Sequence, residues 1–128
     1  MLQKLTICAM LASVTIPAVA ANWEPVARSN SATFYVDTSS IAHVGDIVKV
    51  WTKFANDKPL VDTVGRAPTA YSLNRFAFNC AARAASLMQF SRYDKAGSVT
   101  VSYSWPDYDF QGVVPDSANE AIMKRVCQ

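Results

Sequence analysis

Few residues of this chain have side chains that could do catalytic chemistry. His43 is the only histidine, and Asp107 and Asp109 flank Tyr108 in a loop that contains proline. Histidine is a common general base at neutral pH, and a pair of carboxylates is what a glycosidase uses. Acids in such loops are more often solvated turn formers, and a histidine in a turn-like stretch is more often exposed to solvent. We therefore expect no catalytic residue and no enzyme.

Patterns that bind metals or cofactors are also absent from the sequence. It contains no G-x-S-x-G, H-E-x-x-H, P-loop or G-x-G-x-x-G pattern. Cysteines without C-x-x-C spacing and one histidine do not make a zinc site, and two carboxylates do not make a calcium site. We expect neither a metal nor a cofactor.

The aromatic residues favour binding over catalysis. The chain has three tryptophans, five tyrosines and six phenylalanines, more than a core of this size requires. A tryptophan flanked by lysines can contact a partner, and loops at the end of a sheet often carry binding residues. The alternative is that both faces of the tryptophan's strand are covered, with the lysines at the rim. The candidate binding residues are Lys49, Trp51, Lys53, Trp105, Tyr108 and Phe110.

The elements that would position these residues are mostly β-strands. Residues 32–36 are β-branched and aromatic, and a turn at 44–46 leads into a second strand over 47–54. Side chains alternate between the faces of a strand, so its valines lie on one face, and its tryptophan and two lysines lie on the other. The breakers at 56–59 are expected to end this strand.

Strict alternation marks residues 98–105. Val99, Val101, Tyr103 and Trp105 share one face, and serine or threonine occupies the other. A period of two predicts an antiparallel strand with one buried and one solvated face. The preceding residues, 93–97, have the composition of a hairpin loop, with a glycine available for a positive φ.

The segment Phe76–Arg92 is ambiguous. Its alanines, Leu87 and Met88 favour a helix by propensity, whereas apolar residues at alternate positions favour a strand. The segment also leads directly into the hairpin loop. We predict one long strand, bulged among the alanines, with a helix as the alternative.

The end of the chain predicts a short α-helix. Ser117 and Glu120 form the S-x-x-E pattern of a capping box, in which each side chain accepts a hydrogen bond from a backbone N–H. Ala118, Ile122 and Val126 follow as an apolar stripe, and basic residues occupy the last turn, where the helix dipole favours them. The helix is expected to end near the last cysteine.

The first twenty residues have the pattern of a secretory signal peptide. Lys4 precedes an apolar stretch over 5–16, and the small-residue triplet 18–20 follows. This order predicts cleavage after Ala20, which leaves residues 21–128 as one domain. A transmembrane anchor is the first alternative, but it needs about 20 apolar residues. A lipoprotein is the second, but Cys8 lies near the start of the apolar stretch rather than at its end.

The mature chain is nearly neutral. Without Lys4, the twelve basic side chains become eleven, against ten acidic ones, so the formal charge is +1. This balance predicts no nucleic-acid partner. After signal removal no segment is long and apolar enough to span a membrane.

Cys80 and Cys127 are the cysteines of the mature chain. In an oxidising compartment such a pair predicts a disulfide, which would tie the C-terminal helix to the sheet. Two free thiols or a metal site are the alternatives, and the lack of C-x-x-C spacing together with a single histidine disfavours the latter.

The order of these features resembles the surface-adhesin protein E family of Gram-negative bacteria. The similarity covers nearly all of the mature chain and is carried by Trp23, Tyr35–Asp37, Ser40–Ile41, Val48–Trp51, Asn79–Cys80, Tyr93–Gly97 and Val114–Ser117, before a helix that ends at Cys127. The resemblance implies an α+β fold, in which an antiparallel sheet of about six strands carries a C-terminal helix tethered by the disulfide. It also implies that Phe76–Arg92 is strand.

The resemblance implies an exported binding domain, because the family includes an outer-membrane adhesin that binds host matrix and serum proteins and has been linked to haem binding and dimerisation. No binding motif maps onto this chain residue by residue, so no site residue is carried over. We expect a protein partner, a homodimer formed through sheet edges or faces, and a location in the periplasm or at the cell surface. The alternative is a periplasmic structural or accessory protein that assists envelope assembly or inhibits an enzyme.

Overall fold

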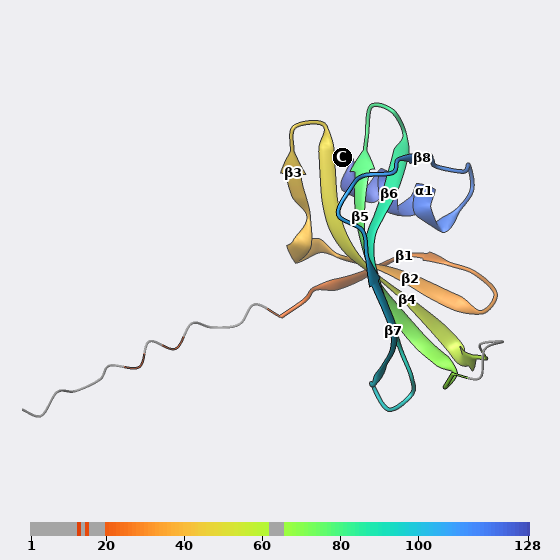
Figure 1. Cartoon of the computed structure of the whole chain (residues 1–128). Helices are drawn as coiled ribbons and strands as arrows, with labels where there is room; N and C mark the ends of the chain where they lie inside the picture. Colours follow the sequence, from red (N-terminus) through yellow and green to blue (C-terminus); the bar gives the residue numbers. More distant parts are fainter. Residues whose placement is uncertain (1–12, 14, 16–19, 62–65) are drawn as a thin grey trace, which may run out of the picture.

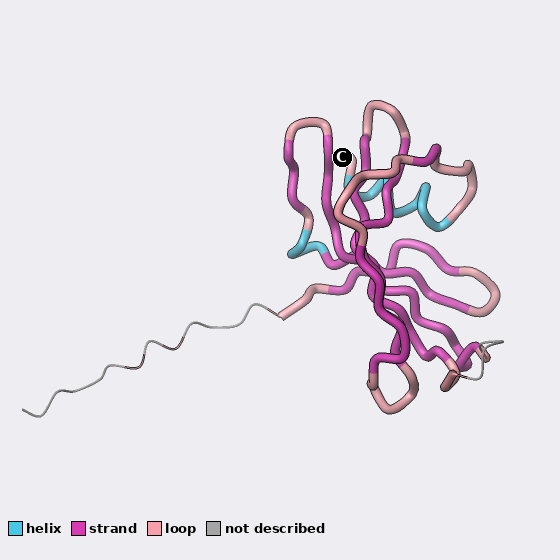
Figure 2. Tube along the Cα trace, in the orientation of Figure 1, coloured by secondary structure: helices cyan, strands magenta, loops and turns pink. Residues whose placement is uncertain are grey.

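The computed structural model describes residues 13, 15, 20–61 and 66–128. They form one antiparallel sheet and one α-helix (Figures 1 and 2). The predicted signal peptide, residues 1–20 with Cys8, lies almost entirely outside the described residues. In the described part of the chain, no helix is long and apolar enough to cross a membrane.

Six strands follow one another across the sheet in the order β1-β2-β4-β5-β6-β7, all antiparallel, while β3 pairs with β4 and β8 pairs with β6. This confirms the predicted fold class, with two short strands added. The elements are β1 Trp23–Arg28, β2 Ala32–Asp37, a 3-10 turn η1 Thr38–Ser40, β3 Ala42–Val44, β4 Ile47–Leu60, β5 Thr69–Asn79, β6 Ala84–Tyr93, β7 Val99–Ser104, β8 Gln111–Gly112 and α1 Ala118–Val126.

The hydrophobic core lies between α1 and one half of the sheet. Val48, Val50 and Phe78, at alternate positions of β4 and β5, point toward the helix and are almost fully buried. Ile122 and Val126, four residues apart on α1, pack against them. Figure 1 shows α1 behind the upper half of the sheet, with the lower half extending beyond it. We call this side of the sheet the helix face.

The segment between β7 and β8 crosses the opposite side of the same half-sheet. Figure 1 shows it passing in front of β5. The backbone N–H of Asp109 donates a hydrogen bond of 2.9 Å to Ser86 Oγ, which fastens the segment to β6. Ser86 and its β5 neighbour Ala77 are buried as a result. The upper half-sheet is therefore covered on both sides, whereas α1 and this segment leave the lower half uncovered.

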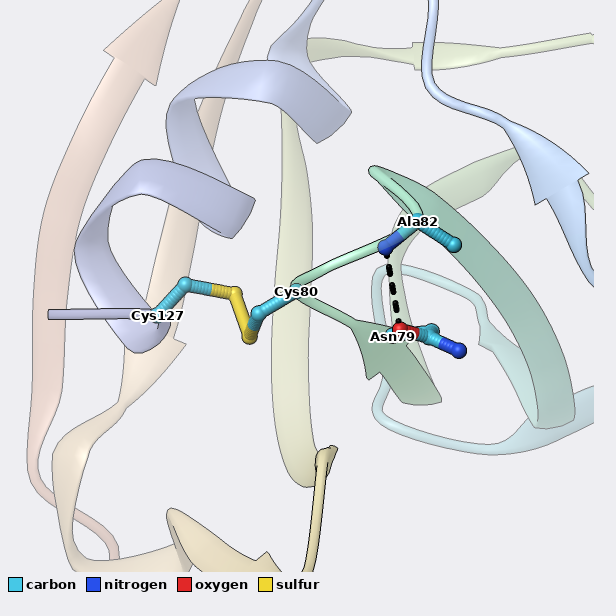
Figure 3. The surroundings of a disulfide bond; sticks show 4 residues. All are labelled: Asn79, Cys80, Ala82 and Cys127. Atoms are coloured by element: carbon cyan, nitrogen blue, oxygen red, sulfur yellow. Dashed lines mark hydrogen bonds between the residues drawn. A yellow bond between two sulfur atoms is a disulfide. The ribbon is translucent and has the colours of Figure 1, made fainter.

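The predicted disulfide is present. Cys80 and Cys127 are bonded, with their Cα atoms 5.7 Å apart. Cys80 directly follows β5, and Cys127 is the C-cap of α1, so the bond joins the last turn of the helix to the sheet (Figure 3). The free-thiol and metal-site alternatives do not apply to these residues.

The prediction of one long strand over Phe76–Arg92 is wrong, although the choice of strand over helix is confirmed. The chain reverses between β5 and β6 in a turn at residues 80–83, where Arg83 has a φ of 50°. Asn79 Oδ1 accepts a hydrogen bond of 3.1 Å from the N–H of Ala82 and stabilises this turn (Figure 3). A register shift does occur in β6, but it leaves Met88 unpaired rather than an alanine.

The prediction that residues 56–59 end the second strand is also wrong. β4 continues to Leu60, which pairs with Thr69 of β5 after a register shift. Asn56 Nδ2 donates a hydrogen bond to the carbonyl oxygen of Thr69, and Asp57 forms an ion pair of 2.7 Å with Arg28. Residues 56–59 stay beside the sheet because these side-chain bonds replace the regular backbone hydrogen bonds between strands.

The predicted burial of one face of residues 98–105 is wrong as well. Val99, Tyr103 and Trp105 are 55 %, 56 % and 44 % exposed. β7 is the last strand of the sheet and lies beyond the half that α1 covers. Its alternation of apolar and hydroxyl side chains therefore does not mark a packed face. The hairpin loop before it forms as predicted, with Gly97 at a φ of 84°.

The capping box at the start of α1 forms, with one change of partner. The N–H of Glu120 donates to Ser117 Oγ at 3.2 Å, and Glu120 Oε1 accepts from the N–H of Asp116 rather than from that of Ser117. Lys124 and Arg83 form ion pairs with the same carboxylate. The backbone N–H of Asp116, then Lys124 and Arg83, hold the pKa of Glu120 below its ordinary value.

Glu120 is expected to stabilise the fold at neutral pH and not in acid. A carboxyl group whose pKa is lowered by folding contributes stability above its unfolded-state pKa, and this stability is lost as pH falls through the folded-state pKa. The variant Glu120→Gln should be less stable than the parent at about pH 6, and the difference should be smaller at about pH 3. Urea unfolding followed by circular dichroism measures both differences. A difference of the same size at both values would contradict the prediction.

Candidate binding surface

The open face is the sheet surface opposite α1, below the segment that crosses β5. Because residues paired across strands share a face, the register aligns its side chains in rows. All of them are at least partly exposed. The first row is Tyr35, Lys53, Leu73, Ser91 and Ser102, the second is Trp51, Arg75, Gln89 and Ser104, and the third is Ala55, Tyr71, Tyr93 and Val99.

The open face carries positive charge without acidic partners. Lys53 and Arg75 are the charged side chains of the three rows, and among the described residues neither forms an ion pair. Lys53 Nζ lies 4.8 Å from the centre of the Tyr71 ring, which stacks on Tyr93 with 4.7 Å between ring centroids. The arrangement is a positively charged surface backed by aromatic rings, which suits an acidic partner.

Trp51 holds a fixed backbone position at the β3 side of this face. Its N–H donates a hydrogen bond of 2.8 Å to Ser40 Oγ, and that hydroxyl donates to the carbonyl oxygen of Asp37 at 2.8 Å. The turn η1 is thereby tied to β4. Trp51 is opposite Arg75 in the strand register, so an indole ring and a guanidinium group occupy neighbouring positions.

Lys49 lies at the upper end of the same face, under the crossing segment. Its Nζ is 5.6 Å from the centre of the Tyr108 ring, and Tyr108 contacts Phe110 with 5.1 Å between ring centroids. Tyr108 is 46 % exposed, so this aromatic pair borders the open face.

The structure separates one predicted binding residue from the others. Lys49, Trp51 and Lys53 share one face of β4, and Tyr108 and Phe110 lie beside Lys49. Trp105 lies on the helix face instead, where its ring centroid is 5.8 Å from that of Phe90. The six residues therefore do not form a single surface.

Sequence reasoning missed Arg75 and the two stacked tyrosines of the open face. Tyr71, Leu73 and Arg75 alternate along β5 and could have been noticed as one face of a strand. Their position beside Lys53 and Trp51 depends on the register between β4 and β5, which a single sequence does not contain.

The histidine considered for catalysis lies apart from the two carboxylates. His43 is exposed on β3, opposite Val48, whereas Asp107 and Asp109 border a cavity on the helix face. Over residues 20–61 and 66–128, no three histidine, cysteine or carboxylate side chains are grouped to hold a metal ion.

Residues 23–128 match the family described as surface-adhesin protein E. No curated protein sequence matches the chain. Among solved structures it is similar to Haemophilus influenzae protein E, with 17 % identity and a TM-score of 0.58 over 89 % of this chain and 90 % of that one. Crystal form II of that protein gives 16 % identity and a TM-score of 0.55 over 85 % and 96 % of the two chains. Protein E from non-typeable Haemophilus influenzae gives 18 % and 0.56 over 91 % and 81 %. These likenesses show a common fold.

Proposed function

This chain belongs to the surface-adhesin protein E family, and we propose that it is an exported binding domain that holds an acidic surface of a partner protein on its open face. The observation that carries the proposal is that two cations and several aromatic rings share the open face. Lys53 and Arg75 have no acidic partner among the described residues, and Trp51 and the stacked tyrosines lie beside them. Aromatic and arginine side chains contribute most of the energy in many protein interfaces.

Family membership supports adhesion to host matrix or serum proteins as the biological role, with the protein at the cell surface or in the periplasm. It also supports a binding rather than a catalytic function. In the described part of the chain, the exposed sheet faces and the edge of β7, which has no strand partner there, support association of two copies, because such an edge can form hydrogen bonds with another chain.

Reversal of the two charges on the open face is expected to weaken partner binding by about tenfold or more, because a like-charge contact replaces an attractive one. The variant is Lys53→Glu with Arg75→Glu, and the ligands are an immobilised basement-membrane extract and whole serum. Surface plasmon resonance measures binding, and light scattering on the same samples shows whether one copy or two is the binding species.

The matched control is Lys58→Glu with Lys95→Glu, which changes the net charge equally at exposed positions outside the three rows. Equal losses in both double variants would show a net-charge effect and contradict the role of the open face. Protease added to intact cells separates the adhesin from a periplasmic accessory protein. Complete protection of the protein from protease would contradict a role in adhesion to host proteins and would support the periplasmic role.

A further inference from the structure

A cavity of about 600 Å³ opens on the helix face of the sheet, and part of its rim is formed by Asp107 and Asp109 of the segment that crosses the other side. Its floor is formed by Phe76, Ala85 and Leu87 of the sheet, and Trp105 forms one wall. The chain after β8 and the first turn of α1 form the other walls. A volume of this size accommodates several side chains, and an apolar floor favours ligands with an apolar part.

The apolar surface of the cavity continues outward along β7. The rings of Phe90, Tyr103 and Trp105 are in mutual contact, with centroids 5.6 to 6.3 Å apart. Tyr103 and Trp105 are half exposed, and Val114 at the opposite rim is 66 % exposed. A ligand that covers the cavity and this aromatic strip must be longer than the cavity itself. An extended peptide meets that requirement. Among the described residues, the outer edge of β7 has no strand partner, so it is available for hydrogen bonds to such a peptide.

The charge at the rim specifies the kind of peptide. Asp107 and Asp109 both border the cavity, and in the described residues neither carboxylate forms an ion pair. Asp109 accepts one hydrogen bond from Gln111 Nε2. Of the cations on this side of the sheet, Arg83 and Lys124 are both bound to Glu120, and Arg92 lies over the Phe90 ring, 5.5 Å from its centre.

The helix N-terminus beside the cavity does not reverse this negative charge. Its partial positive charge is offset by the capping oxygen of Ser117 and by Glu120 in the first turn. The cavity therefore combines an apolar floor, an indole wall and two carboxylates. These features are complementary to a lysine or arginine side chain, which has an apolar stem and a charged end and can stack on tryptophan.

We propose that this cavity binds an extended basic segment of a partner protein, in which a lysine or arginine enters beside Asp107 and Asp109 and neighbouring apolar side chains cover Trp105 and Tyr103. The site is separate from the open face and carries the opposite charge. One domain can thus contact an acidic surface and a basic segment at the same time.

The test titrates the exported protein with a blocked hexapeptide of alternating valine and lysine, followed by calorimetry and by NMR of the tryptophan indole N–H signals. The Trp105 signal is expected to shift, and the signal of Trp51 on the open face is expected to stay unchanged. The variant Asp107→Asn with Asp109→Asn should bind the peptide about tenfold more weakly. The control Asp46→Asn removes an exposed acid outside the cavity and should leave the affinity unchanged.

Several outcomes would overturn the proposal. They are no binding of the valine–lysine peptide, equal binding of a valine–glutamate peptide, and unchanged affinity in the double variant. Butylamine binding as tightly as the peptide would show a site for free amines instead. A shift of the Trp105 signal with protein concentration alone would place a second copy in the cavity. The Lys53→Glu and Arg75→Glu variant should bind the peptide normally. A negative result for the cavity can therefore be distinguished from a negative result for the open face.

Discussion

Replacement of both cysteines, Cys80→Ser with Cys127→Ser, is expected to lower the free energy of unfolding by about 4 kcal/mol. The bond closes a loop between positions 47 apart in the sequence, and its loss increases the conformational freedom of the unfolded chain. A nine-residue helix is marginal without support, and the variant loses the covalent attachment of α1 to the sheet. Urea unfolding followed by circular dichroism measures the change.

Reduction of the parent protein should reproduce the effect, and the same reductant should not change the double variant. If the variant unfolds at the same urea concentration as the parent, the bond contributes nothing to stability, and packing and ion pairs hold α1 in place. Domains of this size have a total stability of roughly 5–15 kcal/mol, so the expected loss is a large fraction of it.

Truncation of Phe78 to alanine is expected to cost about 3–5 kcal/mol. Phe78 is fully buried between the sheet and α1, and its ring lies 5.7 Å from that of Phe76. Deletion of the ring leaves a cavity between α1 and the sheet, and the disulfide holds α1 in place. The neighbouring side chains can therefore fill it only in part. Chemical unfolding at equilibrium gives the value.

The comparison for this variant is Tyr103→Ala, which removes an aromatic ring of similar size from the half-exposed end of β7. We expect it to cost less than about 1 kcal/mol, because surface substitutions away from packed regions have small effects. Equal losses at the two positions would mean that the core is not concentrated under α1.

The elements that the sequence predicted well carry local signals. The pairing of Ser117 with Glu120 marks the start of α1, and Gly97 marks the hairpin before β7, because both depend on residues close together in the chain. The disulfide was also predictable, since export and the count of cysteines leave one pairing.

The errors concern features that depend on distant parts of the chain. The turn between β5 and β6 contains alanine and arginine in place of glycine or proline, and Asn79 before it is a weak local signal. The exposure of Tyr103 and Trp105 depends on where α1 ends relative to the sheet, and Arg75 joins the open face only through the strand register. One sequence does not contain these relationships.

The disulfide also has a consequence for the chain between β7 and α1. That connection is anchored at one end by pairing with β6 and at the other by a helix covalently bound to the sheet. The connection is therefore held in shape, so a ligand would bind a preformed cavity. Little conformational entropy would be lost in ordering that cavity on binding. In a reducing medium the end of the helix would be released, and the cavity would no longer be held in one shape. The affinity for a basic segment should therefore depend on whether the disulfide is intact.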